Sequence, residues 1–462
     1  MTGGLIGIMC LLVFLFFAWL MLSGRLPALL ALPLMAVSIA LIGGIPAPEI
    51  LSDVLGKGAV RLHVAFTTAM FGAMLAQLLT KTGITLQLIR WTAEYAGDDQ
   101  FILGLTLTGL TALLFTTLGG LGTVIMLGTV ILPIMLSVGI PAAAAGGLFL
   151  MGINLGGLFN LGNWQLYKEV LNIPQSQIMA FVLPFGAMMG IIVVAFLAWE
   201  LKKIKRSSLL WTGLLLFSAT SLFFLFKRIP SLPDSKPFFL LAFGLFTLFA
   251  FAQRLWKPKT DAPWAALLTP FVPLFLVLFF GWDILPAFMG GLLYGVLTTW
   301  RKNGINLLTQ SIFEGASTSI PAVVLIMGIG MLLNAVMHPK VAQAIAPLMA
   351  RAVPGHALSF VLVFAVLAPL TLYRGPLSLW GMGSGLVGIL MTTGLLPPPA
   401  IMGMLLSVGQ IQGICDPTNT QNVWTANYLS INTGEVLRKT IAFAWLAAVA
   451  GLIMTAFRFL PW

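Results

Sequence analysis

Apolar runs of about twenty residues recur along the whole chain and are separated by short polar segments. Since an α-helix rises about 1.5 Å per residue, a run of about 20 apolar residues crosses the hydrocarbon core of a bilayer. Hydrophobic residues make up 59% of the 462 residues, more than a soluble core of this length would accommodate. The pattern predicts an all-α polytopic membrane protein with spans near residues 5–22, 27–45, 58–80, 141–161, 178–200, 208–226, 237–253, 264–281, 284–300, 312–337, 398–415 and 437–457.

Two further pairs of apolar segments, residues 101–136 and 357–394, each turn at a glycine-containing sequence. The first turn, Phe115–Thr123, has no charged residue, and an uncharged turn fits a position inside the membrane better than a loop in water. We therefore expect two re-entrant hairpins, whose tips would present the unpaired ends of two short helices. The alternative is two ordinary spans joined by a turn, and the parity of membrane crossings is the same in both cases. Two amphipathic stretches, Thr82–Gly97 and His338–Gly355, are predicted to lie at the membrane interface.

Short sequences of the first half recur in the same order in the second half. Leu26-Pro27-Ala28 has its counterpart in Leu285-Pro286-Ala287. Three more pairs begin at Leu118 and Tyr373, at Gly157 and Gly413, and at Asn172 and Ile431. Each pair is weak alone, but the shared order indicates an internal repeat.

The repeat predicts the organisation of the whole chain. A first repeat would cover residues 1–206, a two-span linker 207–260 and a second repeat 261–462. With about five spans and one hairpin in each copy, the second copy would insert upside down, as in many secondary transporters.

The chain is basic, but its charges are sparse. The formal net charge is +11, while only 8% of the residues are charged. Basic residues stand singly or in short clusters between apolar runs, which fits the orientation of spans better than nucleic-acid binding and favours an outside N-terminus. Lys57 and Arg61 are expected to be interfacial anchors that reach water. Cys10 and Cys415 are isolated and offer neither a disulfide framework nor a zinc motif.

Two charges stand inside apolar sequence and are candidates for function. Arg374 is the only charge between Ala357 and Pro398. At the tip of a re-entrant hairpin, a guanidinium would require an anion or a water-filled cavity, whereas between two full spans it would be a loop residue.

The second charge, Asp416, lies in the sequence GICDPTNTQNVW. The glycine, proline and asparagine there, and in GLFNLGN from Gly157, predict helices that unwind and free backbone groups for a substrate or cation. The alternative for Asp416 is that it caps the following helix together with Thr418, with Pro417 as the first helical residue, and the two interpretations are compatible.

These features resemble the ion transporter superfamily of bacterial carboxylate carriers. The first half, from SGRLPALLALPLMAVSIALIGG to GTVIMLGTVILPIMLSVGIP, is similar to permeases of the citrate:metal and gluconate:proton symporter groups. The resemblance implies inverted repeats, each with a re-entrant hairpin and a discontinuous helix that hold a carboxylate and its coupling cation, and it implies a homodimer. The chain departs from the dicarboxylate branch, whose hairpin tips carry Ser-Asn-Thr.

The function expected from the sequence is secondary active transport of a small organic anion, such as citrate, gluconate or a dicarboxylate, across the inner membrane with H⁺ or Na⁺. A cation/proton antiporter without an organic substrate is the alternative. An enzyme is disfavoured because no in-span Ser/His/Asp, paired-Asp or His-Glu-x-x-His arrangement occurs. No cofactor is expected beyond Na⁺ as a coupling ion, and the expected partners are the anion and the lipid bilayer. The expected substrate ligands are Thr117, Gly119, Gly120, Gly122, Thr123, Asn160, Asn163, Arg374, Gly375, Ser378, Asn419 and Thr420, and the expected coupling-ion ligands are Asp416, Thr418 and Asn422.

Overall fold

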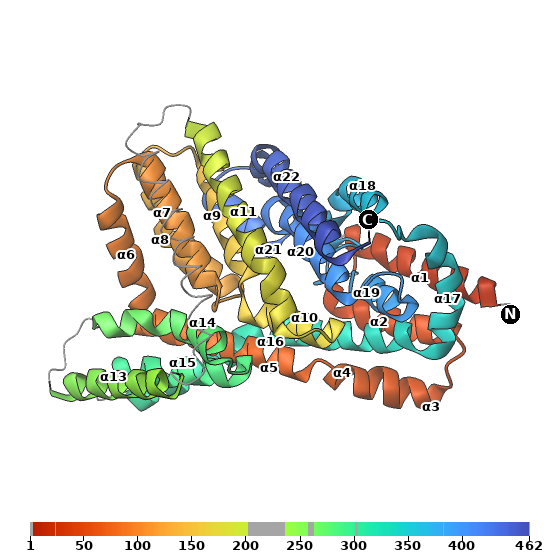
Figure 1. Cartoon of the computed structure of the whole chain (residues 1–462), viewed down its shortest axis with the longest axis horizontal. Coiled ribbons are helices and arrows are strands. Elements are labelled where there is room, and N and C mark those ends of the chain that lie inside the picture. The colour runs from red at the N-terminus through yellow and green to blue at the C-terminus, as the bar shows by residue number, and fades with distance from the viewer. Residues whose placement is uncertain are drawn as a thin grey trace. The chain divides into compact units, whose positions relative to one another are not determined.

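The computed structural model describes residues 3–23, 25–201, 236–256, 263–300, 304–381 and 383–461. All regular elements in these ranges are helices, and no strand occurs among them (Figure 1). The predicted all-α class is confirmed. The predicted span at 208–226 lies outside the described residues.

The first half of the chain forms an ordered series of long and short helices. The elements are α1 (Gly3–Leu22), α2 (Ala28–Ile42), α3 (Ala47–Glu49), the π-helix η1 (Ile50–Lys57), α4 (Gly58–Val60), α5 (His63–Thr82), α6 (Ile84–Ala96), α7 (Gln100–Phe115), α8 (Leu121–Ser137), α9 (Ala142–Leu158), α10 (Leu161–Leu171) and α11 (Gln175–Leu201).

The second half follows a similar order. Its elements are α13 (Lys236–Trp256), the 3₁₀-helix η4 (Trp264–Phe271), α14 (Val272–Phe275), the π-helix η5 (Leu276–Phe280), α15 (Ile284–Thr298), α16 (Gly304–Met337), α17 (Pro339–Ala352), α18 (Ala357–Leu367), the 3₁₀-helix η6 (Ala368–Arg374), α19 (Gly383–Thr393), α20 (Pro398–Cys415), α21 (Thr420–Tyr428) and α22 (Thr433–Phe459). In both halves an amphipathic helix, a pair of short apolar helices, a broken helix and a long helix follow one another. The inverted orientation of the two copies stays a prediction.

Helix length and composition identify a multi-pass membrane protein. Among the described residues, five helices are long and apolar enough to cross a membrane, and a sixth crossing results if the bent pair α9–α10 is one span. The five are Gly4–Met21, Ala47–Thr82, Gln175–Leu201, Gly304–Met337 and Thr433–Phe459.

The spans predicted at 27–45 and 284–300 are shorter than expected. Their helices, α2 and α15, have 15 residues each. At about 1.5 Å per residue each is about 22 Å long, which is less than the ~30 Å hydrocarbon core. Both helices start within one residue of the predicted position and end before the predicted end, α2 at Ile42, before Gly43 and Gly44, and α15 at Thr298.

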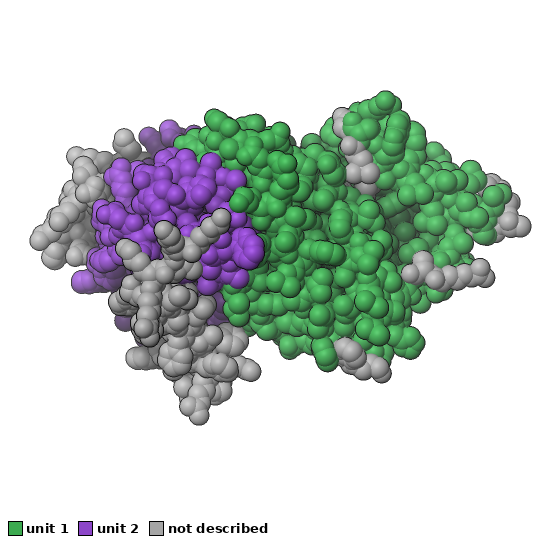
Figure 2. All heavy atoms as spheres, turned by 90° about the horizontal axis from the view of Figure 1, so that it is seen from above, with its two compact units in different colours: residues 1–67, 163–192, 320–462 green, residues 68–162, 193–319 purple. Residues whose placement is uncertain are grey.

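The chain forms two compact units, coloured separately in Figure 2. Unit 1 contains residues 1–67, 163–192 and 320–462, and unit 2 contains residues 68–162 and 193–319. Each unit therefore takes segments from both predicted repeats. The division of the chain into 1–206, 207–260 and 261–462 concerns sequence order and stays a prediction.

Within unit 2, α7 and α9 approach closely through glycines. Gly152 of α9 lies against the Thr108 carbonyl, and Gly156 lies against the Ala112 carbonyl and the Phe115 side chain, so that a Cβ at either glycine would clash. Glycines spaced by one helical turn allow the backbones of membrane helices to come close. The two helices run parallel, so the end of α9 lies beside the end of α7.

Within unit 1, α20 and α22 pack through small residues in an antiparallel arrangement. Gly403 of α20 lies against Thr455, and Gly451 of α22 lies against Ser407. At the end of α20, Cys415 Sγ lies 3.2 Å from Thr440 Oγ1. This packing fixes the position at which α20 ends and the chain unwinds.

Candidate functional site: two hairpin tips and two broken helices

The first hairpin, in unit 2, ends in an open glycine tip. Gly120, at φ +83° and ψ 164°, occupies a backbone conformation that only glycine adopts readily, and α8 begins directly after it. Gly119, Gly120 and Gly122 are exposed, and no atom lies within 4 Å of a Cβ built at any of them. The threonines on either side are buried: Thr117 Oγ1 donates to the Pro270 carbonyl at 2.8 Å, and Thr123 Oγ1 donates to the Gly119 carbonyl at 2.9 Å.

The first helix break is joined directly to this tip. Helices α9 and α10 are bent by 50° at the break between Leu158 and Leu161. Asn160, in the break, donates its side-chain amide to the carbonyls of Phe115, at 2.8 Å, and Leu118, at 2.9 Å. The Leu161 N–H donates to the Thr116 carbonyl at 3.1 Å. The side-chain amide of Asn160 therefore connects the helix break to the hairpin tip through two hydrogen bonds.

The second hairpin, in unit 1, has one short arm, α19, and a partly buried tip, in which Tyr373 is exposed and Gly375 and Ser378 are buried. Helix α18 continues directly into η6, so that one apolar helix runs from Ala357 to Tyr373, whereas α19 has only 11 residues, about 17 Å, which is too short to cross a bilayer. The backbone turns at Tyr373, with φ +57°, and Gly375 packs against the Leu370 carbonyl, where a Cβ would clash. Arg374 is the last residue of η6, and its side chain lies outside the described part of the structure.

Ser378 joins the second hairpin to the second broken helix. Its hydroxyl donates to Gln412 Oε1 of α20 at 2.7 Å, and its side chain is 1% exposed. Both units therefore contain a hairpin tip that is hydrogen-bonded to a broken helix. Gln412 is not among the residues predicted from the sequence, although a glutamine in an apolar run is a signal of a polar contact.

The second break contains the fully buried carboxylate of Asp416, which is 0% exposed. Asp416 Oδ1 accepts hydrogen bonds from the Thr418 N–H at 2.8 Å and the Thr418 hydroxyl at 2.7 Å. Gln421 Nε2 donates to the Gly413 carbonyl at 3.1 Å, and so supplies a partner to the end of α20.

The prediction that Asp416 caps the following helix, with Pro417 as its first residue, is wrong. The residue before the first turn of α21 is Asn419, and α21 begins at Thr420, not at Pro417. The Asp416 side chain instead closes a local turn with Thr418 at the end of α20. The carboxylate thus stabilises the unwound segment itself.

Asn422, in the first turn of α21, has an unsatisfied acceptor. Its side chain is 4% exposed, and its Oδ1 is buried without a hydrogen-bond partner among the described residues. A buried acceptor without a partner costs about 1–3 kcal/mol, which a bound cation or proton donor would offset. Thr418 and Thr420 are exposed and Asn419 is half-buried, while Asn163 lies half-buried in the first turn of α10.

The described residues contain no group of three or more His, Cys, Asp or Glu side chains arranged to hold a metal ion. The predicted coupling-ion ligands Asp416, Thr418 and Asn422 offer a carboxylate, a hydroxyl and an amide oxygen. Carboxylate, amide and carbonyl oxygens are the ligands that hard cations take.

Comparisons with known proteins support the fold. No protein-family model and no curated protein matches the sequence. Among solved structures, the chain is similar to the crystal structure of the Alcanivorax borkumensis YdaH transporter, described as having an unusual topology. The sequence identity is 14%, the TM-score is 0.56, and the match covers 96% of this chain and 98% of that chain. The chain thus has the fold of a polytopic membrane transporter, while the resemblance to citrate and gluconate permeases stays a prediction.

Proposed function

We propose that this protein is a secondary active transporter that moves a small organic anion across the membrane together with H⁺ or Na⁺. The observation that carries the proposal is the buried carboxylate of Asp416 at a helix break that is tied, through Gln412, to the hairpin tip at Ser378. Broken helices and hairpin tips expose backbone groups at membrane depth, which is how secondary transporters bind ions and substrates.

Asp416 would bind the coupling cation or proton, with Asn422 Oδ1 as a second ligand. A fully buried carboxylate in a membrane protein is costly unless a positive charge or a proton meets it. The two hydrogen bonds from Thr418 hold one carboxylate oxygen in place. A Na⁺ ion or a proton would bind at this oriented carboxylate.

Arg374 would bind the carboxylate of the substrate. A guanidinium forms bidentate, charge-assisted hydrogen bonds with carboxylates. The backbone of Arg374 stands between η6 and Gly375, at the tip that contains Ser378. The open glycine tip and the break at Asn160 are the equivalent elements of unit 2, and their residues stay predicted substrate ligands.

A cation/proton antiporter is the second candidate function, because the carboxylate of Asp416 could bind either a cation or a proton without any organic anion. The two functions differ in whether an organic anion moves. We also propose that the protein lies in the inner membrane and forms a homodimer. Both proposals rest on the sequence resemblance alone.

Uptake into proteoliposomes tests the proposal. Labelled carboxylates are offered under an inward Na⁺ gradient, an inward proton gradient or no gradient. We expect gradient-dependent uptake of at least one carboxylate by the wild type, and its loss in Arg374→Ala. Arg90→Ala, at an exposed arginine of α6, is the matched control and should transport normally. Wild-type uptake by Arg374→Ala would remove the proposed anion ligand, and cation-driven proton movement without a carboxylate would favour the antiporter.

A further inference from the structure

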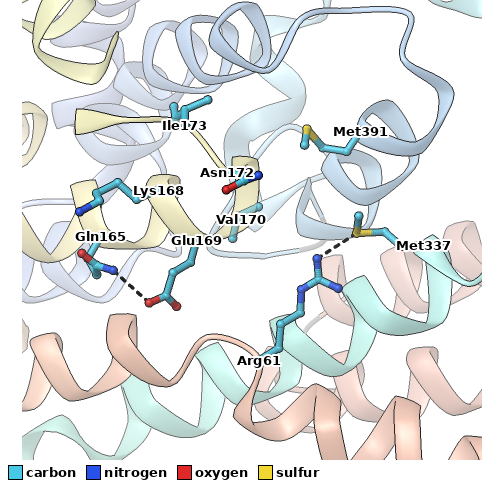
Figure 3. Close-up of a pocket in the computed structure, with 9 residues that line it drawn as sticks. All are labelled: Arg61, Gln165, Lys168, Glu169, Val170, Asn172, Ile173, Met337 and Met391. Atoms are coloured by element: carbon cyan, nitrogen blue, oxygen red, sulfur yellow. Dashed lines mark hydrogen bonds between the residues drawn. The ribbon is translucent and has the colours of Figure 1, made fainter. Parts of the chain in front are cut away.

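Unit 1 contains a cavity of about 610 Å³ that includes none of the residues discussed above as substrate or ion ligands (Figure 3). Its lining comes from the turn after α4, from α10 and the turn that follows it, from the end of α16 and from α19. The volume is in the range of small-molecule sites. Its polar lining consists of Arg61, Gln165, Lys168, Glu169 and Asn172, and its apolar lining includes Met337 and Met391.

Arg61 presents a positive charge to this cavity. Its guanidinium is held by neutral groups: Nη1 donates to Asn334 Oδ1 at 2.6 Å, and Nη2 donates to Met337 Sδ at 3.3 Å. Asn334 is fixed in turn by its hydrogen bond to the Asp53 carbonyl at 2.7 Å. None of the ion pairs among the described residues includes Arg61. Arg61 is thus half-buried and oriented, which differs from the anchor in water that the sequence predicts.

Glu169 presents a negative charge to the same cavity. Its Oε1 accepts a hydrogen bond from Gln165 Nε2 at 3.0 Å, and its Oε2 is buried without a hydrogen-bond partner in the described part of the chain. Figure 3 shows the Glu169 carboxylate and the Arg61 guanidinium on opposite sides of the cavity, with Lys168 extending away from Arg61. Arg61 and Glu169 therefore face one space without forming an ion pair with each other, and Lys168, which also lines the cavity, lies beside Glu169 in the chain.

The remaining lining residues complete an amphipathic site. Asn172 lies above both charges in the view of Figure 3 and has a φ of +51°, a conformation that asparagine tolerates better than most residues. Met337 and Met391 supply thioether side chains, which adapt to apolar groups of different shape. A partly desolvated charge needs a complementary charge, and here two such charges of opposite sign are held apart.

We propose that this cavity is a binding site for a small zwitterion, such as an α-amino acid or a dipeptide. The ligand's carboxylate binds Arg61, its ammonium group binds Glu169, and its aliphatic part packs against the two methionines. This inference goes beyond the proposed transport function, since it uses neither hairpin tip nor helix break. Its test measures binding and does not depend on transport.

The experiment compares ligands that differ only in their charged groups. Leucine and leucylleucine carry both charges, 4-methylpentanoate lacks the ammonium group, and isopentylamine lacks the carboxylate. Binding to the purified protein in detergent is measured by titration calorimetry. We expect a zwitterion to bind at least about tenfold more tightly than either singly charged analogue, because each loses one charge-assisted interaction.

Two variants show which charged group of the ligand binds Arg61 and which binds Glu169. Arg61→Gln should weaken binding of the zwitterion and of 4-methylpentanoate but leave isopentylamine unchanged, and Glu169→Gln should do the reverse for the two analogues. Arg90→Gln and Glu94→Gln, at exposed positions of α6, are the controls. Melting curves without ligand show whether each variant is folded, and a misfolded Glu169→Gln is replaced by Glu169→Ala, which also removes the charge. Absence of zwitterion binding to the wild type, or equal effects of both variants on all ligands, would overturn the proposal.

Discussion

At the scale of single residues, the carboxylate of Asp416 and the glycine at the first hairpin tip carry the most specific expectations. Asp416 is fully buried and accepts two hydrogen bonds on one oxygen from Thr418. Gly120 has a backbone conformation that an L-residue adopts only at a cost. Each feature leads to a substitution with a defined physical effect.

Replacing Asp416 with asparagine removes the negative charge and keeps the shape of the side chain. We expect gradient-driven uptake in proteoliposomes to fall by about tenfold or more, because a charge-assisted interaction contributes about 1.5–3 kcal/mol. Glu94→Gln, which neutralises an exposed carboxylate of α6, should leave uptake unchanged. If Asp416→Asn retains wild-type uptake under every gradient, Asp416 does not bind the coupling ion.

Replacing Gly120 with alanine should strain the hairpin tip by about 1–3 kcal/mol, because a φ of +83° with ψ 164° is nearly exclusive to glycine. No atom lies within 4 Å of the new Cβ, so the effect would be conformational and not steric. Gly119→Ala is the matched control, since Gly119 is equally open and has no positive φ. The measurements are substrate affinity and melting temperature, and equal values for the two variants would contradict the expectation.

The sequence predicts the position of Asp416 inside an apolar region and the need of its segment to unwind. The sequence does not predict the hydrogen-bond partners of the other side chains at the candidate site. Asn160 was expected to contact substrate, and both its amide hydrogens bind backbone carbonyls of the hairpin. Such partners depend on which helices lie side by side, and that is decided by tertiary packing.

At the scale of elements, the repeated association of a hairpin tip with a broken helix is the main feature of the fold. In unit 2 the connection consists of Asn160 and the Leu161 N–H, and in unit 1 it consists of Ser378 and Gln412. The two tips differ, since the glycines of the first are exposed, whereas Gly375 and Ser378 of the second are buried. The open tip therefore depends on its hydrogen bonds to the break for a fixed position.

Replacing Asn160 with alanine should loosen that connection. Two hydrogen bonds are lost, each worth about 0.5–1.5 kcal/mol, so we expect a loss of stability of about 1–3 kcal/mol and a lower melting temperature. Asn427→Ala, at an exposed residue near the end of α21, should change stability by less than about 0.5 kcal/mol. Equal melting temperatures for the two variants would show that the amide of Asn160 does not hold the tip.

Most elements follow from hydrophobic pattern, and the deviations have physical causes. The amphipathic helices α6 and α17 and both helix breaks occur where the sequence predicts them. The helix predicted at 58–80 instead belongs to an element that starts at Ala47 and includes the π-helix η1. π-helical turns depend on the packing around them, and an apolar pattern carries no signal for them.

At the scale of the whole molecule, the proposed transport requires that the anion and the cation bind interdependently. Coupling between two ligands is reciprocal, so each should raise the affinity for the other. The fold of a polytopic membrane transporter is compatible with such coupling but does not identify the ions.

Thermal unfolding of the purified protein measures this interdependence. A carboxylate that binds should raise the melting temperature by mass action. With Na⁺ coupling, the increase should be larger in NaCl than in choline chloride of equal ionic strength, and Asp416→Asn should abolish the difference. Equal increases in both salts would exclude Na⁺ as the coupling ion, and stabilisation by Na⁺ without any carboxylate would favour the antiporter.

The glycines at which α9 meets α7 have a mechanical consequence. Gly156 has no side chain, so helices α7 and α9 lie close together at this position. The side chain of Asn160 can therefore reach the carbonyls of Phe115 and Leu118. A methyl group at residue 156 would clash with α7 and push the two helices apart. The amide of Asn160 would then no longer reach its two carbonyl partners. The hydrogen bonds of the first tip thus depend on a residue without a side chain four positions before Asn160, at which no side-chain hydrogen bond is made.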